Sequence, residues 1–275
     1  MFIDRCNSTN TLLKELIANG QWPTAENYLY TGFQTAGRGQ TGNGWESEAN
    51  KNLLCSIVVE KYFRAHQQIS KEECPFFLNV AVSVALHRVV AETIWLTTLE
   101  TEADKALTIK WPNDLYYGDK KLAGILIESA ITGQEMTHAI VGIGLNVHQT
   151  EWHSDAPNPT SLKLVCEAIT GEPEEWDIAD LMDALYKELE HVLDEPHSLT
   201  WWYYKNHLYR KEGFWPFVER EVSLAPTMNA KANARANANA FLAHIQDVLP
   251  TGEIVLQDQQ GKTHTYHFKQ VRYVV

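Results

Sequence analysis

The sequence predicts an α+β fold, in which a mixed domain of residues 1–213 precedes a small β module of residues 214–275. Strand-like runs alternate with helical patterns in the first half, helical patterns follow, and short strands with turn residues close the chain. With 275 residues, 44% of them hydrophobic, the chain can bury a sizeable core. Together these observations favour an α+β domain with an appended small barrel.

The first elements follow from hydrophobic spacing and helix signals. Four apolar residues at helical spacing after Asn10 predict a helix that stops at Gly20. Residues 28–34 and 52–60 are strand-like and flank a Gly-rich loop. Pro75 suits a first helical position, so a helix is expected from there to about Thr93.

Strands are expected next at 108–112, 121–128 and 137–147, with a Gly118-Asp119 turn that makes a hairpin. The last of these strands contains Gly142 and Gly144. Glycine inside a strand often marks the close approach of a ligand or of another backbone.

The second half turns helical and then β-rich. Helices are expected at 161–170, after Asp177 and around 201–208, and strands at 240–249, 253–258 and 263–268. An Ala/Asn-rich insertion at about 225–240 has side chains too small to build a core, so it reads as an exposed loop or linker.

Bulk properties exclude several classes of function. A formal net charge of −12 opposes non-specific binding of nucleic acid, and no helix-turn-helix pattern precedes the first motif. The longest apolar stretch, Phe76 to Val90, contains four polar residues and looks too short and too polar to span a membrane. The four cysteines form no CxxC pair and the scattered histidines form no HExxH, so a disulfide framework or zinc site is not expected. Reduced thiols and no signal-peptide pattern predict a cytoplasmic protein.

The most informative segment is the Gly-rich loop, residues 34–45, which reads Gln-Thr-Ala-Gly-Arg-Gly-Gln-Thr-Gly-Asn-Gly-Trp. Glycines let a backbone approach a ligand, and a concave run of N–H groups binds anions. Arg38 adds a guanidinium suited to phosphate or carboxylate. The loop matches neither a P-loop nor a dinucleotide turn, and the alternative is a Gly-rich surface hairpin.

Three further motifs follow, each weak alone. Residues 110–115 read Lys-Trp-Pro-Asn-Asp-Leu, residues 120–128 read Lys-Lys-Leu-Ala-Gly-Ile-Leu-Ile-Glu, and residues 142–147 read Gly-Ile-Gly-Leu-Asn-Val. In this order, after Ser8-Thr9-Asn10 and the Gly-rich loop, they closely resemble the biotin–protein ligase family, in its short form without an N-terminal DNA-binding domain. The resemblance is strong from about Asn7 to Val147 and returns in the terminal β module.

The resemblance implies a fold related to class II aminoacyl-tRNA synthetases, with a C-terminal SH3-like barrel. It implies an ATP-dependent, AMP-forming ligase. Biotin and ATP, used with Mg²⁺, give biotinyl-5′-AMP, and biotin then passes to one lysine of a biotin carboxyl carrier protein. The implied partners are therefore biotin, ATP and that carrier protein, with no nucleic acid and no membrane, and the chain is expected as a monomer or homodimer.

The chemistry of that reaction suggests roles for the matching residues. Two anions must be brought together, which calls for preorganised cations and N–H donors. The catalytic candidates are Lys121, to bridge the biotin carboxylate and the α-phosphate, and Arg38, to hold the anions under the closed loop. Residues expected to contact biotin are Ser8, Thr9, Asn10, Gln34, Gly37, Arg38, Gly39, Gln40, Lys121 and Gly124. Residues expected to contact the nucleotide are Arg38, Gln40, Trp45, Lys110, Asn113, Asp114, Lys121 and Asn146, and Asp114 could reach Mg²⁺.

One departure from the family's pattern stands out. Relatives commonly carry arginines where this loop has Gln40 and Asn43, so the roles of those positions are weakened. Two other functions remain open: a lipoate- or octanoate–protein ligase of the same fold, and a non-catalytic biotin-binding regulatory protein. The Lys-Trp-Pro-Asn-Asp motif opposes the first, and the intact Lys121 and Arg38 oppose the second.

Overall fold

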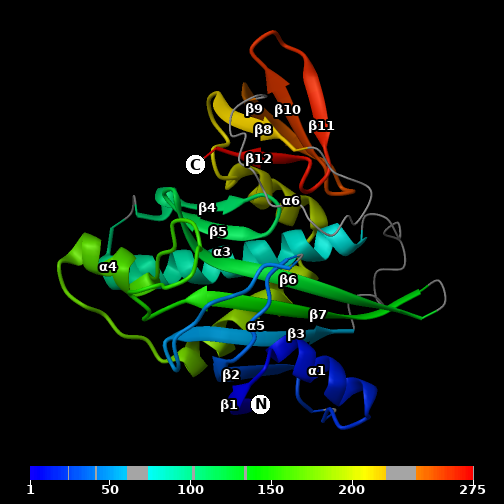
Figure 1. Ribbon diagram of the computed structural model, residues 1–275, viewed down its shortest axis with the longest axis vertical. Coiled ribbons are helices and arrows are strands. Elements are labelled where there is room, and N and C mark those ends of the chain that lie inside the picture. The colour runs from blue at the N-terminus through cyan, green and yellow to red at the C-terminus, as the bar shows by residue number, and fades with distance from the viewer. Residues whose placement is uncertain are drawn as a thin grey trace.

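The computed structural model describes residues 1–23, 25–40, 42–60, 74–100, 103–132, 135–220 and 240–274. They form a seven-stranded sheet and a five-stranded sheet, with helices packed around the larger one (Figure 1). The helices are α1 (Thr9–Ala18), α3 (Cys74–Thr98), α4 (Leu162–Thr170), α5 (Ile178–Asp194) and α6 (His197–Asn206), with a 3-10 turn at Ala103–Ala106. The helices expected from the sequence are all present.

The larger sheet has the strand order β1-β2-β3-β7-β6-β5-β4. Its strands are β1 (Phe2–Cys6), β2 (Tyr28–Gln34), β3 (Asn52–Val59), β4 (Leu107–Lys110), β5 (Asp114–Tyr117), β6 (Lys120–Thr132) and β7 (Glu135–Asn146). Strand β1 runs parallel to β2, and the other neighbouring pairs are antiparallel. The sequence did not predict β1, because this edge strand is mostly exposed and lacks an alternating apolar pattern.

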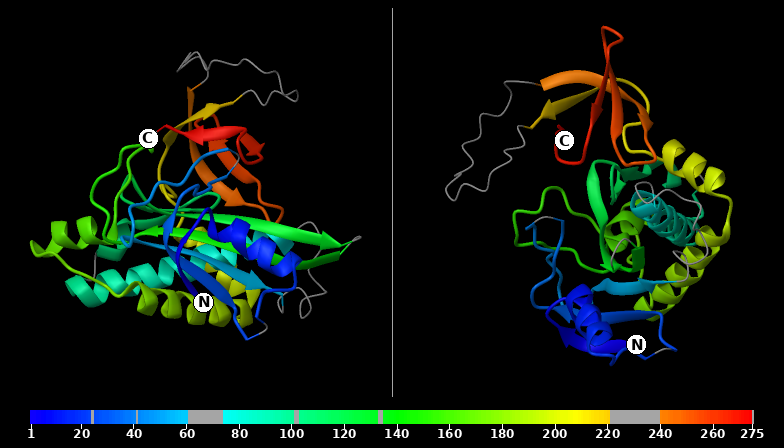
Figure 2. Two further views of the ribbon diagram at one scale, coloured as in Figure 1. Left: turned by 60° about the horizontal axis from the view of Figure 1, so that its bottom comes forward. Right: turned by 90° about the vertical axis from the view of Figure 1, so that its right-hand side faces the viewer.

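The two faces of the larger sheet have different partners. Helices α3 and α5 cover one face, and α1 lies against the other (Figure 2). In β7, Val141, Ile143 and Leu145 belong to the core shared with α3, whereas Gly142 and Gly144 alternate with them. Since successive strand residues point to opposite faces, both glycines face away from α3 and α5, on the side where α1 lies. We call this side the open face of the sheet.

Helix α3 is mostly apolar and packs in the core of the larger domain, although Arg88 forms ion pairs with Glu188 and Glu195. By length and composition, Phe76–Thr98 could cross a membrane, and 72% of its apolar window is buried inside the protein. The expectation that this stretch is too short and too polar for a span was therefore wrong. A helix that is hydrophobic all round fits burial in a large core equally well.

The smaller sheet has the order β11-β10-β9-β8-β12. Its strands are β8 (Trp215–Glu219), β9 (Ala240–Val248), β10 (Ile254–Asp258), β11 (Thr263–Tyr266) and β12 (Val271–Tyr273). Strands β8 and β12 were not predicted. Strand β12 is too short to show a periodic pattern. The Ala/Asn-rich insertion lies outside the described residues, apart from its last position, Ala240, which opens β9.

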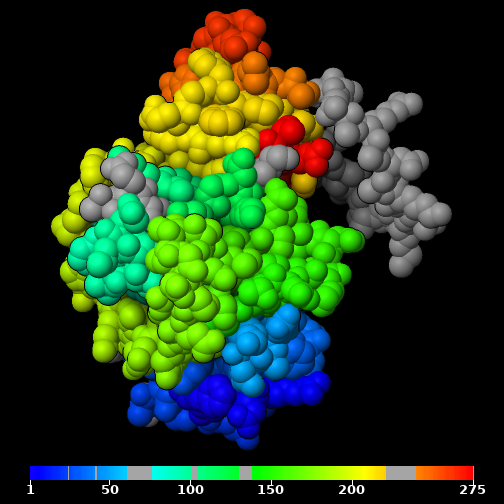
Figure 3. Space-filling model, turned by 90° about the vertical axis from the view of Figure 1, so that its left-hand side faces the viewer, coloured from blue at the N-terminus to red at the C-terminus, as the bar shows by residue number. Residues whose placement is uncertain are grey.

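The smaller sheet packs on the β4–β5 side of the larger one, and Figure 3 shows it at the end of the molecule opposite the N-terminal segment. The indole of Trp111 donates to the carbonyl of Gly252 at 3.1 Å. A Cβ at Gly252 would lie 2.7 Å from the Phe76 ring, so only glycine allows this contact. Lys205 and Asp247 add an ion pair at 2.6 Å. The contacts fix the position of the smaller sheet, whose strand β12 pairs with β8 and reaches the candidate site.

Candidate active site

A cavity of about 640 Å³ lies between the open face of the larger sheet, the Gly-rich loop and the C-terminal sheet. Thirteen of the fifteen residues proposed from the sequence line it: Ser8, Thr9, Asn10, Gln34, Arg38, Gly39, Gln40, Trp45, Lys110, Asn113, Asp114, Lys121 and Gly124. Motifs separated by more than a hundred residues therefore meet in one place.

Gly37 and Asn146 do not line the cavity. A Cβ at Gly37 would lie 2.5 Å from the carbonyl oxygen of Trp45, so this glycine serves the close approach of the loop's two arms. Asn146 is buried, and its amide nitrogen donates to the carbonyl of Thr160 at 2.8 Å. Its Oδ1 is buried with no hydrogen-bond partner among the described residues. Contact of either residue with a ligand stays a prediction.

The Gly-rich loop folds as a small hairpin whose two arms pair. Arg38 and Gly44 form an antiparallel bridge, and the Trp45 amide donates to the Gly37 carbonyl at 2.9 Å. The amide of Gly39 donates to the carbonyl of Asn43 at 2.7 Å. The alternative reading as a hairpin was thus correct for local structure, while the same hairpin also walls the cavity.

Two glycines of neighbouring strands form the floor beneath this hairpin. Gly124 of β6 pairs with Gly144 of β7 on the open face. The Trp45 ring covers both, since a Cβ would lie 3.1 Å from that ring at Gly124 and 2.5 Å from it at Gly144. Even a methyl group at Gly144 would collide with the indole. The sequence needs glycine here because a flat aromatic ring lies directly on the backbone.

The N-terminal end of α1 fixes a polar corner of the cavity. The Thr9 amide donates to Gln34 Oε1 at 2.7 Å, and the Thr9 hydroxyl lies 3.2 Å from the same oxygen. Ser8 is the N-cap residue, yet its hydroxyl makes no cap hydrogen bond. Helix capping therefore does not account for Ser8, which is buried and lines the cavity.

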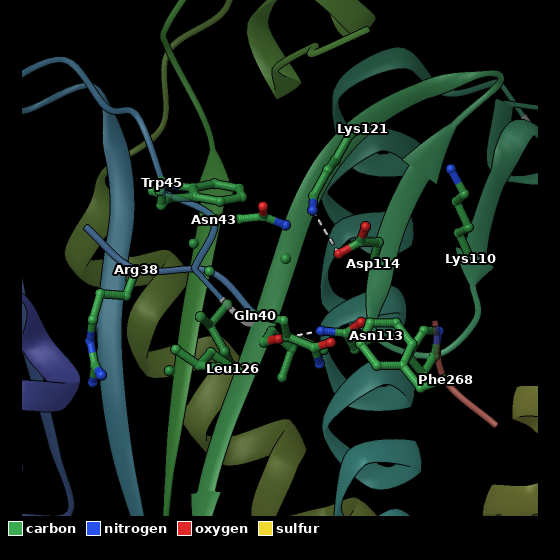
Figure 4. A pocket seen from close by; sticks show the side chains of 18 of the residues that line it. Arg38, Gln40, Asn43, Trp45, Lys110, Asn113, Asp114, Lys121, Leu126 and Phe268 are labelled. Carbon is green, nitrogen blue, oxygen red and sulfur yellow. Dashed lines mark hydrogen bonds and ion pairs between the residues drawn. The ribbon is translucent and has the colours of Figure 1, made fainter. Parts of the chain in front are cut away.

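The two candidate catalytic cations are each paired with a carboxylate, and the structure does not bring them together. Lys121 Nζ lies 2.7 Å from Asp114 Oδ1 and 5.6 Å from the centre of the Trp45 ring. Arg38 Nη2 lies 2.7 Å from Glu128 Oε2. Figure 4 shows the Arg38 side chain directed away from the Lys121–Asp114 pair.

Asn113 has a structural contact, because its buried side-chain amide donates to the carbonyl of Ile125. Its bond joins the loop after β4 to strand β6. The side chain therefore braces the wall that carries Asp114, and contact with a nucleotide stays a prediction.

Lys110 lies among tyrosine rings. Its ammonium donates to the Tyr116 hydroxyl at 2.9 Å and lies 4.2 Å from the centre of that ring. Tyr209 and Tyr273 place their ring centres 5.7 Å and 5.4 Å away. Burial lowers the pKa of the Lys110 ammonium to about 8, against the attraction of Asp114. The attraction between the ammonium and the faces of the tyrosine rings partly compensates for the loss of its hydration.

Comparison with known proteins places this site in a family. The model described as the biotin/lipoate A/B protein ligase family matches residues 2–146, which is more than half of the chain. The chain belongs to this family. The match contains every element of the sheet wall described above, from the Ser8-Thr9-Asn10 corner to the glycine floor.

Curated relatives agree with this membership. The bifunctional ligase/repressor BirA of Salmonella typhimurium is 32% identical over 138 residues, which are 50% of this chain and 38% of that protein. The biotin–[acetyl-CoA-carboxylase] ligase of Mycobacterium tuberculosis is 35% identical over 134 residues, 49% of this chain and 44% of that protein. The aligned region spans about half or less of the length of these relatives.

Solved structures share the fold. A biotin protein ligase from Aquifex aeolicus, in complex with biotin and ATP, matches with a TM-score of 0.68 at 18% identity and covers 100% of this chain and 98% of that chain. A Leishmania major ligase in complex with biotinyl-5-AMP matches with a TM-score of 0.60 at 21% identity, with 97% of each chain covered. The whole α/β architecture, including the C-terminal sheet, is thus that of biotin protein ligases.

The sequence reasoning missed the part of this ligase-family cavity that comes from the C-terminal sheet. The additional lining residues there are Arg220, Phe268, Lys269, Val271, Arg272, Tyr273 and Val274. Three of them are cations, and the Tyr273 hydroxyl is buried without a hydrogen-bond partner among the described residues. No local motif marks them, because they reach the cavity only through the packing of the smaller sheet against the larger one.

A metal site made wholly of protein ligands is absent from the part of the chain that the structure describes, where no group of three His, Cys, Asp or Glu side chains could hold an ion. Asp114 offers one carboxylate, shared with Lys121. A single carboxylate fits an ion that arrives with phosphates, since Mg²⁺ usually takes one or two carboxylates together with substrate oxygens.

Proposed function

We propose that this chain is a biotin–protein ligase, which forms biotinyl-5′-AMP from biotin and ATP and transfers biotin to a lysine of a biotin carboxyl carrier protein. One observation carries the proposal. Lys121 projects at the point where the glycine-floored pocket meets the polar wall of Asp114 and Lys110, all within one cavity. Family membership and the names of the relatives support it.

The glycine-floored pocket suits the acid. Ser8, Thr9 and Gln34 give a polar corner for a ureido group, which has one carbonyl acceptor and two N–H donors. The Trp45 ring and Leu126 supply apolar surface for a ring and an alkyl chain. The acid's carboxylate would then point towards Lys121.

The other end of the cavity suits a nucleotide. Lys110 and Lys121 lie on the sheet side, and Lys269 and Arg272 lie on the C-terminal side. Cations on two facing walls are suited to the spread charge of a triphosphate. Mg²⁺ held by ATP would neutralise part of that charge, and Asp114 is the residue that would contact it.

This placement supports the following two-step reaction. An oxygen of the biotin carboxylate attacks the α-phosphorus, the bond to the bridging oxygen breaks, and pyrophosphate leaves. Lys121 lowers the repulsion between the two anions and stabilises the charge that builds on the α-phosphoryl oxygens. The lysine amine of the carrier then attacks the acyl carbon, loses a proton, and AMP departs.

We further propose the finer fold assignment: residues 1–213 are the catalytic domain, related to class II aminoacyl-tRNA synthetases, and residues 214–275 are an SH3-like module. The five short strands of the smaller sheet and its position over the cavity support this division. The carrier protein is expected to approach the mouth of the cavity between the two sheets.

Pyrophosphate release from ATP, measured with biotin, lipoate, octanoate or no acid, tests the proposal. Release only with biotin, together with the mass of biotinyl-5′-AMP, is the expected result. Preference for lipoate or octanoate would make the chain a lipoate-type ligase of the same family. Biotin binding without pyrophosphate release would make it a regulatory binding protein.

A further inference from the structure

The carboxylate of Glu128 ties the Gly-rich loop to the rest of the cavity. Its Oε2 accepts from Arg38 Nη2 at 2.7 Å and from the side-chain amide of Asn10 at 2.9 Å. One oxygen atom thus joins the loop, the first turn of α1 and strand β6. Glu128 is the last residue of the motif at residues 120–128.

Glu128 is itself held in place by a buried hydrogen-bond network. Asn10 is 3% exposed, and its Oδ1 accepts from the buried hydroxyl of Ser56 at 2.6 Å. Its amide nitrogen also donates to the Leu126 carbonyl at 3.2 Å. A Cβ at Gly142 would lie 2.3 Å from Asn10 Oδ1, so β7 leaves room for this side chain. The Asn10 amide therefore has a fixed direction, and it aims at Glu128.

The Gly-rich loop contacts the sheet at two separate points. Trp45, at the end of one arm, lies on the glycine floor of Gly124 and Gly144. Arg38, on the other arm, reaches Glu128. Because the Arg38–Gly44 bridge joins the two arms, fixing both contacts fixes the hairpin over the pocket. Loss of either contact frees one arm.

We propose that Glu128 is a positioning residue for adenylation, which holds the Gly-rich loop over the acid through its ion pair with Arg38. The inference rests on the proposed ligase function. Arg38 then acts as an anchor of the loop, and the anion-binding task falls to Lys121 and the cations of the C-terminal wall. An Arg38 that bound the phosphate would have to leave Glu128 and turn back towards Lys121 (Figure 4).

A double-mutant cycle with Arg38→Met and Glu128→Gln tests this. Charge-assisted bonds are strong, but the Arg38 side chain is 44% exposed, so we expect each single variant to raise the KM for biotin about fivefold to tenfold. Release of biotinyl-5′-AMP should accelerate by a similar factor, with kcat within about threefold. Because both variants break one contact, the double variant should resemble the singles. Arg38→Lys should recover part of the loss.

Glu188→Gln is the matched control. Glu188 pairs with Arg88 at 3.1 Å between α5 and α3, and its side chain has the same 26% exposure as Glu128. It does not line the cavity. Wild-type KM for biotin is expected in this variant. The proposal would be overturned if the effects of the two substitutions on the KM for biotin were additive. It would also be overturned if Glu128→Gln had wild-type kinetics while Arg38→Met was inactive. Either result would indicate that Arg38 binds the substrate anion directly.

Limited trypsin digestion gives a readout without substrates. Cleavage after Arg38, followed by the mass of fragment 1–38, should be several-fold faster in Glu128→Gln than in wild type or Glu188→Gln. A wild-type protein without biotin-dependent pyrophosphate release would overturn the proposed function, and the positioning role with it. An active Glu128→Gln protein with unchanged cleavage and unchanged KM would overturn the positioning role alone.

Discussion

The two walls of the cavity are built differently. On the sheet wall, the side-chain amides of Asn10 and Asn113 donate hydrogen bonds to partners within the protein. Glycines leave the floor of this wall without side chains. On the C-terminal wall, Arg272 is exposed and Lys269 is partly exposed. The first wall has a fixed shape and carries Lys121 paired with Asp114, whereas the second adds exposed cations. This difference teaches that selection of the acid should depend on shape and that binding of the nucleotide should depend on charge.

The largest effect is expected where the two properties meet, at Lys121. Lys121→Ala should lower the rate of biotin-dependent pyrophosphate release by roughly a hundredfold or more, since it removes a cation positioned for the transition state. Lys120→Ala is the control, because this neighbour is exposed and does not line the cavity. Adenylation within tenfold of wild type in Lys121→Ala would refute the assignment of Lys121.

The shape of the sheet wall can be tested at its floor. In Gly144→Ala the new methyl would lie 2.5 Å from the Trp45 ring, so the indole must lift. Overpacking of this kind costs about 1–3 kcal/mol, which predicts a roughly tenfold to hundredfold loss of biotin affinity. In Gly44→Ala the new methyl meets only a carbonyl oxygen at 3.8 Å. Calorimetric titration with biotin should therefore separate the two variants, and equal affinities would show that the floor does not set the shape.

The two walls also differ in how far the sequence could predict them. Strand β2 was predicted with its observed bounds, and Gly144 was expected to mark a close approach to its strand, because strand periodicity and glycine placement are local properties. Tyr273 and Arg272 were missed, since their place depends on the docking of the whole smaller sheet, in which Trp111 contacts Gly252. The pairing of Arg38 with Glu128 was missed as well, because sequence spacing does not show which of several carboxylates faces a given cation.

The Gly-rich loop allows a test in which charge is added to the sheet wall. Gln40 stands where relatives commonly have arginine, and its Oε1 is buried without a hydrogen-bond partner among the described residues. Gln40→Arg would add a charge-assisted contact to the adenylate, worth about 1.5–3 kcal/mol against about 1 kcal/mol for a neutral one. Release of preformed biotinyl-5′-AMP should slow about tenfold. Gln40→Met controls for packing, and equal slowing by both variants would show that charge is not the cause.

Lys110 joins the two walls, because Tyr116 belongs to the sheet and Tyr273 to β12. Burial lowers the pKa of its ammonium from 10.5 to about 8, so the charge is lost as the pH rises through 8. The KM for ATP should then rise a few-fold between pH 7 and 9 in wild type. Lys110→Arg, which stays charged, should keep a KM that does not change with pH over this range.

Stability should respond with the opposite sign. Between pH 8 and 10.5 the unfolded chain binds the proton that the folded protein has released, so the free energy of unfolding gains a contribution that increases with pH. Lys110→Met lacks this contribution, and its stability relative to wild type should be highest near pH 7 and decline above pH 8. Chemical denaturation at several pH values measures this difference. Weaker ATP binding together with a more stable fold over one pH interval would identify Lys110 as the group that titrates. A KM that rises equally in Lys110→Arg would assign the pH dependence to another group.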